Sequence, residues 1–480
     1  MENEVLTREE VLKKRELLCR IADFGFTGEG YVRLEDGWLS IAGALPGELV
    51  RVKVQENQRK GARRIYADLL EVIEKSSSRR DPACVYDALC RGCQLRHLTI
   101  DAEFRFKVRT VSEVIERYAG IGIEAQPTVE VISPQPIARS DAFRIRSSLR
   151  YRRQNGTFEL GLFSHGAEHL IPMVKCPALT QAVQRMIGLV EESLRELPNI
   201  PFDAALYQEL RSHAEDLRIS PGLVQISLAA PTHGVGLVDI QLTDVEDLDE
   251  LQNALKEEPY RGWINNLRKI LPSGVGLSVQ SNNHRIHLSG PERIRVPLGS
   301  WRMEVGFDDW FHANLEPAER IYEELKNWLS LRKEDRVLDV GCGTGTIALM
   351  LSPSVREVVG IDVNRSSIEA AQINALSHER QNATFLTGGW EKALRKLVIQ
   401  QEQFDVATIN PMREPLGRRP LSFLAATGVR EILYLGPSPE SASRDLAELL
   451  DLGFELKRLG AANLHPATYH TFLMALLQRK

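Results

Sequence analysis

The pattern of apolar positions in the last third of the chain predicts an α/β domain. From about Leu315, helix-spaced apolar residues such as Ile321, Leu325 and Trp328 alternate with short apolar runs. These runs, which predict buried strands, are Arg336 to Val340, Glu357 to Ile361, Asp405 to Ile409 and Glu431 to Leu435. Alternating helices and strands predict a doubly wound, Rossmann-like parallel sheet that binds ligands at the carboxyl ends of its strands. We therefore expect an α/β domain over residues 301–480.

The first part of the chain follows other patterns. Thr7 and Glu10 stand at capping-box spacing, which predicts a helical extension over residues 1–18. Over residues 19–75, short alternating runs such as Leu49 to Val54 are separated by glycine-containing turns, which predicts a small OB-like β-barrel. Residues 76–300 mix strands and helices and predict a central α+β domain. A chain of 480 residues exceeds one core, so a multidomain α/β protein is expected.

Charge and composition restrict the partners. The net charge of −5 excludes a uniformly basic surface, so any contact with nucleic acid must be local. The N-terminus has no apolar signal region, and no stretch approaches eighteen uninterrupted apolar residues. We expect a soluble, cytoplasmic protein with no membrane partner.

Two groups of basic residues are candidates for a local contact with nucleic acid. Arg59, Lys60, Arg63 and Arg64 fall on one predicted hairpin of the barrel. In the central region, Phe143, Ile145, Leu149 and Tyr151 alternate with Arg144, Arg146, Arg150 and Arg152, which predicts four guanidinium groups on one outer face of a strand. Both groups fit phosphate binding, and both equally fit a solvated or salt-bridged surface.

A glycine-rich loop carries the clearest signal for a ligand. The strand ending at Val340 leads through Gly341, Gly343 and Gly345 into a predicted helix that begins near Thr346. Asp339 precedes the loop, and Asp362 ends the next strand, where a carboxylate can accept hydrogen bonds from ribose hydroxyls. This arrangement resembles the S-adenosylmethionine (SAM) motif of class I methyltransferases. A dinucleotide-binding oxidoreductase is the alternative, but the loop is not GxGxxG.

The cysteines indicate a metal site. Three of the six, Cys84, Cys90 and Cys93, lie within ten positions, and Cys176 is the plausible fourth ligand. Four thiolates can bind zinc in a tetrahedral site or hold an iron–sulfur cluster, and the spacing does not decide between them.

The segment Cys90-Arg91-Gly92-Cys93-Gln94-Leu95-Arg96-His97-Leu98 resembles the CGGCQLQHL signature of RNA uracil-C5 methyltransferases. Residues 19–73 resemble the RNA-binding TRAM domain of that family, and Phe311-His312-Ala313-Asn314 stands where the family has FQVN. The resemblance implies a structural 4Fe-4S cluster on the four cysteines, SAM as cofactor with His312 and Asn410 beside it, and structured ribosomal or transfer RNA as partner. We expect a monomer.

Two departures from the family pattern bear on the chemistry. Methylation of uracil C5 needs a cysteine thiolate that adds to C6 and a base that removes the C5 proton. The family's SCNP loop is Gly436-Pro437-Ser438-Pro439 here, so Pro437 stands at the nucleophile position, and Phe472 stands at the base position. Neither Ser438 nor Cys342 restores the covalent route convincingly. His465 and His470 are candidate acids or bases, although packed or solvated histidines are more common.

Lesser changes point the same way: Asn410-Pro411-Met412-Arg413 replaces DPPR, and Gly389 replaces a usual aspartate. We therefore name no catalytic residue and predict an RNA-binding protein of this family that cannot methylate uracil C5 by the cysteine route. The alternative is an active SAM-dependent RNA methyltransferase that uses other residues or another acceptor atom. A cofactor-binding structural protein without an RNA role is the third hypothesis.

Overall fold

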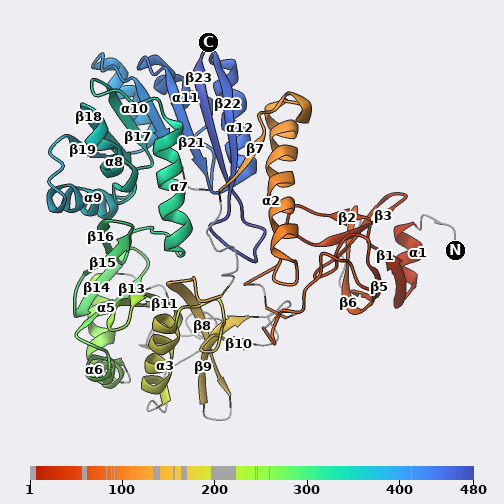
Figure 1. The fold of residues 1–480 in the computed structure, drawn as a ribbon. Helices are drawn as coiled ribbons and strands as arrows, with labels where there is room; N and C mark the ends of the chain where they lie inside the picture. The colour runs from red at the N-terminus through yellow and green to blue at the C-terminus, as the bar shows by residue number, and fades with distance from the viewer. Residues whose placement is uncertain are drawn as a thin grey trace.

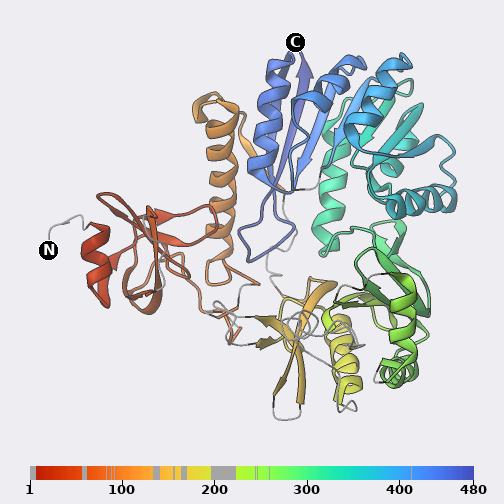
Figure 2. The same ribbon diagram turned by 180° about the vertical axis from the view of Figure 1, so that it is seen from behind.

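The computed structural model describes residues 7–56, 62–82, 84–87, 89–90, 92–132, 141–154, 157–163, 170–195, 223–243, 245, 247–258, 260–411 and 413–480. Three bodies are visible in Figures 1 and 2: an N-terminal β-rich body at one side, a central body, and a C-terminal sheet flanked by helices. Arg59, Lys60 and Met412 lie outside the described residues.

The N-terminal body begins with the predicted helix. Helix α1 (Arg8–Lys13) carries the capping box, in which the Glu10 N–H donates to Thr7 Oγ1 at 3.2 Å and the Thr7 N–H donates to Glu10 Oε2 at 2.7 Å. Val11 is fully buried against the barrel core, so the helix packs on the barrel. The barrel strands are β1 (Glu16–Arg20), β2 (Asp23–Phe24), β3 (Gly30–Leu34), β4 (Gly37–Ile41), β5 (Leu49–Val54) and β6 (Arg64–Glu74), in the order β1-β5-β6-β4-β3-β2.

A long connection then joins the C-terminal sheet, which the sequence interpretation did not anticipate. Helix α2 (Ile100–Val114) is followed by a π-helical turn (Ile115–Ala119), a 3-10 turn (Ile123–Ala125) and strand β7 (Val129–Ile132). Strand β7 pairs in parallel with β22 (Phe454–Ala462) at the edge of the C-terminal sheet, and α2 runs beside that sheet (Figure 1). The region predicted as one central domain, residues 76–300, therefore contributes elements to two bodies.

The central body is built on a sheet with the order β10-β9-β8-β11-β12-β13-β14. Its strands are β8 (Arg146–Gln154), β9 (Thr157–Phe163), β10 (Leu170–Pro172), β11 (Leu223–Thr232), β12 (Val235–Leu242), β13 (Gly274–Ser281) and β14 (His284–Ser289). Helices α3 (Gln181–Arg195), α5 (Leu248–Lys256) and α6 (Tyr260–Ile270) belong to the same body, and side chains from α3, α6 and the sheet share one apolar core.

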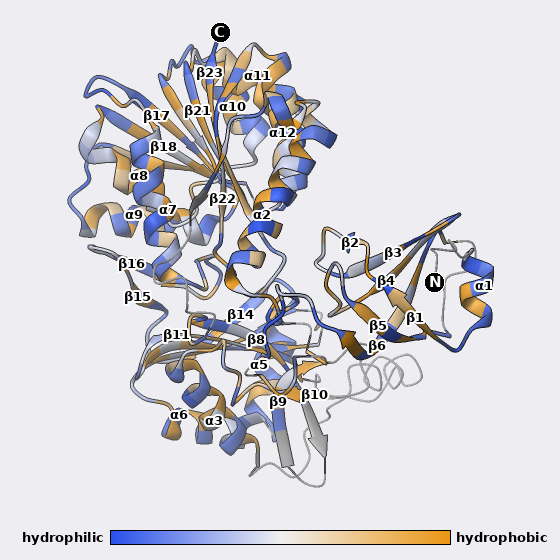
Figure 3. Ribbon diagram, turned by 45° about the vertical axis from the view of Figure 1, so that its right-hand side comes forward, coloured by the Kyte–Doolittle hydropathy of each residue, from blue (hydrophilic) through white to orange (hydrophobic). Residues whose placement is uncertain are grey.

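The C-terminal body contains the predicted parallel sheet, extended by further strands. Its order is β19-β18-β17-β20-β21-β23-β22-β7, with β17 (Arg336–Val340), β18 (Glu357–Asp362), β19 (Ala383–Thr387), β20 (Val406–Ile409), β21 (Glu431–Gly436) and β23 (Phe472–Arg479). The strands from β19 to β21 in this order are the predicted parallel sheet, and β23 joins it in antiparallel pairing with β21 and β22, which the prediction did not include. The helices are α7 (Leu315–Trp328), α8 (Thr346–Leu351), α9 (Arg365–Ser377), α10 (Trp390–Ile399), α11 (Arg418–Ala426) and α12 (Pro439–Asp451). The strands are largely apolar (Figure 3) because helices cover both faces.

A hairpin, β15 (Arg293–Leu298) and β16 (Trp301–Gly306), connects the central and C-terminal bodies. Asn374 on α9 fixes it, because its side-chain carbonyl accepts from the Glu304 N–H at 2.6 Å and its amide donates to the Glu304 carbonyl at 3.2 Å. In the described part of the chain, none of the helices is long and apolar enough to cross a membrane.

Arg144, Arg146 and Arg150, the members of the predicted arginine row whose side chains are described, do not form the open, solvated face that the alternation predicted. Arg144 and Arg146 are only partly exposed, and each lines a cavity. Arg150 is exposed and donates to the Val224 carbonyl at 2.9 Å. The period of two did place Phe143, Ile145 and Leu149 in the core, but elements of the C-terminal body cover part of the opposite face.

Candidate functional site

The loop between β17 and α8 needs glycine at two positions, because the backbone there has a positive φ and leaves little or no room for a Cβ atom. Gly341 has φ +78°, and a Cβ atom there would lie 2.2 Å from the Asn410 carbonyl oxygen. Gly345 has φ +83°, and a Cβ atom there would lie 3.0 Å from Ala371 and Phe385. The loop therefore lies directly against the end of β20, where the backbone N–H of Asn410 donates to the Val340 carbonyl at 2.8 Å.

Two carboxylates hold the loop in different ways. Asp362 accepts hydrogen bonds from the Gly343 N–H at 2.9 Å and from the Asn364 N–H at 2.8 Å. Asp339 lies behind the loop, where it accepts from Thr408 Oγ1 at 2.7 Å and from the Ala348 N–H at 3.2 Å. Burial raises the pKa of Asp339 to about 7.

The loop opens into a cavity of about 700 Å³, within the usual range for ligand sites. Of the predicted cofactor residues, Gly341, Gly343, Thr346, Asp362, His312 and Asn410 line this cavity, which we call the cofactor cavity. Asp339 and Gly345 lie outside its lining, because one supports the loop from below and the other turns the chain into α8.

His312 is a buried, neutral imidazole in the cavity wall. Its Nε2 atom lies 2.5 Å from the hydroxyl of Tyr322 on α7. Burial lowers the pKa of His312 to about 3 and raises that of Tyr322. The ring is also close to the Trp310 ring, with centroids 4.6 Å apart. His312 therefore offers the cavity an uncharged aromatic surface at neutral pH.

Pro437 and Phe472, the residues that the sequence resemblance aligns with the family's nucleophile and base, lie in the same wall. Both line the cofactor cavity, and Phe472 is 2% exposed. The Phe472 ring lies 6.0 Å from the His465 ring and 6.4 Å from the His312 ring, centroid to centroid. A compact aromatic group therefore fills this part of the wall.

His465 and His470 complete this aromatic wall, and their ring centroids lie 6.1 Å apart. Burial is the main cause that lowers the pKa of His465 to about 3 and that of His470 to about 4, and nearby cations act in the same direction. Both imidazoles are neutral at pH 7 and able to accept a hydrogen bond.

The loop that carries these histidines is held by a buried ionic group that the sequence interpretation missed. Glu103 and Lys107 on α2 pair at 2.9 Å, and Lys107 also donates to Asn463 Oδ1 at 2.6 Å. Glu103 accepts from Asn463 Nδ2 at 3.0 Å and from the Ala467 N–H at 3.0 Å. The two charges stand four positions apart on a helix, which by itself reads as an ordinary surface pair.

The four predicted metal-ligand cysteines come together. Cys84, Cys90, Cys93 and Cys176 line one cavity of about 20 Å³, beside Arg96 and Arg144. Burial raises the pKa of Cys90 to about 11, and the three other thiols act in the same direction. As their side chains stand, the described residues form no group of three or more His, Cys, Asp or Glu arranged to hold a metal ion. The metal assignment therefore stays a prediction.

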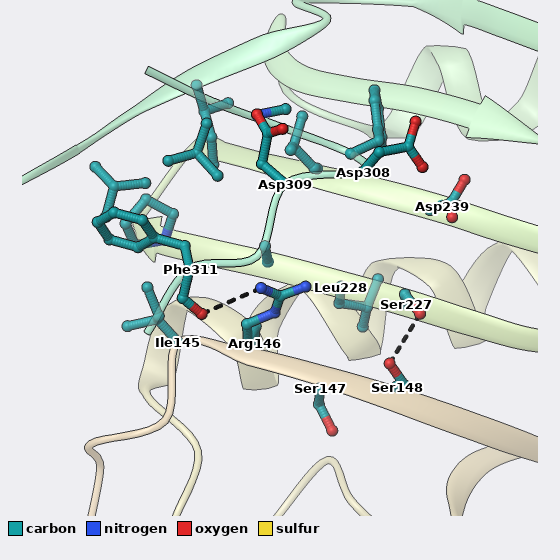
Figure 4. Close-up of a pocket in the computed structure, with 18 of the residues that line it drawn as sticks. Ile145, Arg146, Ser147, Ser148, Ser227, Leu228, Asp239, Asp308, Asp309 and Phe311 are labelled. Atoms are coloured by element: carbon teal, nitrogen blue, oxygen red, sulfur yellow. Dashed lines mark hydrogen bonds between the residues drawn. The ribbon is translucent and has the colours of Figure 1, made fainter. Parts of the chain in front are cut away.

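A second cavity, of about 300 Å³, adjoins the cofactor cavity. It lies between the central sheet and the segment that follows β16, and six residues line both cavities: Arg146, Phe307, Asp308, Asp309, Phe311 and His312. Figure 4 shows Arg146 reaching from β8 toward Phe311, whose carbonyl accepts from Arg146 Nη1 at 3.2 Å. We call this space the side cavity.

Comparisons with known proteins agree with this architecture. Residues 331–453 match the family described as "Methyltransferase domain". An uncharacterised RNA methyltransferase of Clostridium acetobutylicum is 26% identical, with 98% of each chain covered. A 23S rRNA (uracil(1939)-C(5))-methyltransferase of Pseudomonas entomophila is 26% identical, with 97% of this chain and 94% of the relative covered.

Among solved structures, the tRNA (uracil-54, C5)-methyltransferase of Pyrococcus abyssi in complex with S-adenosyl-L-homocysteine superimposes with a TM-score of 0.64. The sequences are 18% identical, and the match covers 96% of this chain and 100% of the other. At this identity the match supports the fold. The C-terminal body thus contains a region that matches a methyltransferase domain. Along nearly its whole length, the chain is similar to proteins named RNA uracil-C5 methyltransferases, the family that its sequence motifs resemble.

Proposed function

We propose that this protein binds RNA and SAM and does not methylate uracil C5 by the cysteine route. The observation that carries the proposal is that Pro437 and Phe472 line the cofactor cavity. The sequence resemblance aligns these two residues with the family's nucleophile and base. The thiol in the described lining is Cys342, and burial raises its pKa well above the ordinary value. A buried neutral thiol is a weak nucleophile.

The same cavity supports the proposal that SAM binds. The glycine loop leaves room for a ligand beside its backbone, and Asp362 lies at the end of β18, where a carboxylate accepts from ribose hydroxyls. Trp390 and His312 add aromatic surface to the lining. The Pyrococcus relative, whose solved form holds S-adenosyl-L-homocysteine, agrees with this assignment.

Three measurements on the anaerobically purified protein test this function. Isothermal titration with SAM should give saturable binding. Incubation of RNA with the protein and labelled SAM should give no 5-methyluridine, and RNA containing 5-fluorouridine should form no covalent adduct, because such an adduct requires the thiolate that Pro437 lacks. Formation of 5-methyluridine would overturn the proposal.

A methyltransferase that acts on another atom is the second candidate, and the neutral imidazoles of His465 and His470 favour it. An acceptor nitrogen would attack the SAM methyl group, S-adenosylhomocysteine would leave, and the nitrogen's proton would pass to an imidazole or to water. With both pKa values near 3 to 4, these histidines are weak bases. A methylated base other than 5-methyluridine, lost in the His470→Asn variant, would establish this activity.

RNA is the expected partner, in agreement with the names of the similar proteins from Clostridium acetobutylicum and Pseudomonas entomophila. A groove between the barrel and α2 adds support, since arginines and two exposed aromatic rings line it: Arg8, Arg33, Arg63, Arg64, Arg109, Arg117, Phe26 and Trp38. Four carboxylates share this lining, namely Glu29, Glu35, Asp36 and Glu113, and Glu29 pairs with Arg64 while Glu113 pairs with Arg109. Phe26 and Trp38 are 39% and 44% exposed. Exposed aromatic rings among arginines suit stacked, single-stranded bases. We expect RNA mobility shifts that weaken with salt, and unchanged mobility would favour a structural protein without an RNA role.

The four-cysteine cavity belongs to the proposal as a cluster or zinc site. The donor set fits: four thiol groups meet there, and Arg96 and Arg144 lower the pKa of Cys93 against the effect of burial. A bound 4Fe-4S cluster would link the segment before α2, which contains Cys84, Cys90 and Cys93, to Cys176 in the central body. Iron, sulfide and zinc analysis of the anaerobic protein should find about four iron atoms. Cys176→Ser should lose them, and Cys19→Ser, which alters a cysteine in the barrel core, should keep them.

A further inference from the structure

One charged group in the wall of the side cavity, the guanidinium group of Arg146, has no partner of opposite charge among the described residues. Three carboxylates line this cavity, and each is paired with an arginine other than Arg146. Asp239 and Asp308 pair with Arg285 at 3.1 and 2.7 Å, and Asp309 pairs with Arg293 at 2.8 Å. In Figure 4 these carboxylates lie across the cavity from the β8 backbone that carries Arg146.

The positive charge of Arg146 is balanced by few polar contacts. Among the described residues its hydrogen-bond partner is the Phe311 carbonyl, and it forms no ion pair. Burial lowers the pKa of Arg146, and Asp309 opposes this effect from a distance. Because a guanidinium group stays charged in proteins, a largely buried cation of this kind is costly unless an anion reaches it.

The position of Arg146 restricts which anion can bind its guanidinium group. The side chain lines both the cofactor cavity and the side cavity, so it stands where the two join. Ser148 and Asp308 are exposed, so the side cavity opens to solvent at their side. The rest of its wall is partly apolar, with Leu228, Leu237 and Val296 among its residues. Among its polar groups are the Ser147 hydroxyl, the Ser227 hydroxyl, which lies 2.9 Å from Ser148 Oγ, and the Gln280 amide, whose oxygen accepts from Arg285. The volume of about 300 Å³ is at the lower end of the range for small-molecule sites.

From this geometry we infer that Arg146 binds the RNA phosphate between the nucleotide in the cofactor cavity and its neighbour, and that the side cavity holds the neighbouring nucleoside. This inference rests on the proposed RNA binding. A guanidinium group binds a phosphate through two parallel hydrogen bonds. In the side cavity, the apolar residues give the neighbouring base a surface to pack on, and the serine hydroxyls and the Gln280 amide give it hydrogen-bonding groups. The protein would then hold two successive nucleotides in two adjoining cavities.

The cofactor's own carboxylate is the other anion that could reach Arg146, and the experiment separates the two. Arg146→Gln, Arg146→Lys and the control Arg268→Gln are compared with the wild type. Arg268 is an exposed arginine that also donates to a backbone carbonyl, that of Leu288, and it lines neither cavity. Binding is measured with a mixed-sequence 20-nucleotide single-stranded RNA across a salt series, and with S-adenosylhomocysteine by titration.

We expect Arg146→Gln to bind the RNA about tenfold more weakly. The slope of log affinity against log salt should fall by about 0.7, the value for one lost contact to single-stranded RNA. Arg146→Lys should keep the slope and lose part of the affinity, since it keeps the charge without the fork. Arg268→Gln should match the wild type, and S-adenosylhomocysteine should bind all four proteins equally.

A scan with neutral methylphosphonate linkages adds a pairwise test. One linkage should weaken binding to the wild type about tenfold and leave binding to Arg146→Gln unchanged, because both changes remove the same contact. If the wild type binds no RNA, the proposed function fails and this inference with it. If the wild type binds RNA and Arg146→Gln binds it equally, only the inference fails. Loss of S-adenosylhomocysteine binding in Arg146→Gln would assign the cation to the cofactor and overturn the inference.

Discussion

The backbone N–H of Leu95 donates a 2.8 Å hydrogen bond to the carbonyl of Ala467. This bond joins the segment just after Cys93 to the loop that brings His465 and His470 into the cofactor cavity. Ala467 has φ +62°, so the loop is held in a conformation that alanine rarely adopts. The opposite side of the same residue is fixed by Glu103, which accepts from the Ala467 N–H. The cysteine segment and α2 therefore set the shape of the cavity wall together.

Substitution of Lys107 should destabilise the loop that carries His465 and His470. Lys107→Met leaves Glu103 as a buried carboxylate without its cation, and such a change typically costs about 3 to 5 kcal/mol. We expect a lower denaturation midpoint and faster hydrogen exchange at Ala467. Arg109→Met is the matched control on the same helix, because its partners Asp23 and Glu113 are partly exposed and its loss should cost less than about 1 kcal/mol. Equal effects in the two variants would contradict a role of the buried pair.

A side chain at Gly341 should weaken SAM binding selectively. A Gly341→Ala substitution would force a Cβ atom against the Asn410 carbonyl at a positive φ. We expect SAM affinity to fall at least about tenfold, measured by titration, because the loop must move away from β20. Gly188→Ala, in the middle of α3 with nothing within 4 Å of the added atom, should bind SAM normally and be about 1 kcal/mol more stable. Normal SAM binding by Gly341→Ala would show that the loop tolerates the shift.

Local patterns predicted much of this structure because they depend on near neighbours in sequence. Thr7 and Glu10 define the first helix within one turn, and the runs at 336–340 and 405–409 are buried strands because helices cover both faces of the sheet. The glycine loop was similarly predictable, since its glycines and Asp362 lie at fixed offsets from two strands.

Features that depend on distant partners were not predictable. Strand β7 has four residues and pairs with β22, more than 300 positions later, so its membership in the C-terminal sheet has no local signal. The alternation around Arg146 correctly separated two faces of β8, yet it could not show that Phe311 approaches one of them. The burial of Lys107 likewise depends on Asn463, at the other end of the chain.

The protein should become less stable as the pH falls, because the buried His312 cannot be protonated in the folded state as readily as in the unfolded chain. Burial lowers its folded-state pKa from 6.5 to about 3, so below pH 6.5 the unfolded chain binds a proton that the folded chain does not. The contribution of His312 is therefore complete above pH 6.5 and is lost as the pH falls toward 3. Between pH 7 and pH 5 this amounts to about 2 kcal/mol.

Urea unfolding of His312→Gln at pH 7 and pH 5 measures this effect. The variant should lose about 2 kcal/mol less than the wild type over that interval. His233→Gln, a substitution at an exposed turn, should retain the wild-type pH dependence. An unchanged pH dependence in His312→Gln would mean that His312 is protonated or exposed in the folded protein.

The aromatic wall around Phe472 should not accept the family's carboxylate. The Phe472 side chain is 2% exposed and lies between the rings of His312 and His465, so Phe472→Glu would bury a carboxylate among aromatic rings. We expect this variant to lose at least about 3 kcal/mol of stability. Phe472→Leu, which keeps the site apolar, should cost less than about 2 kcal/mol. Adding Pro437→Cys to Phe472→Glu should therefore yield no 5-methyluridine. If that double variant is stable and forms 5-methyluridine on RNA, the cavity has kept the geometry of C5 methylation and lost only the two side chains. If it is stable, binds SAM and RNA, and remains inactive, the surrounding wall has diverged as well.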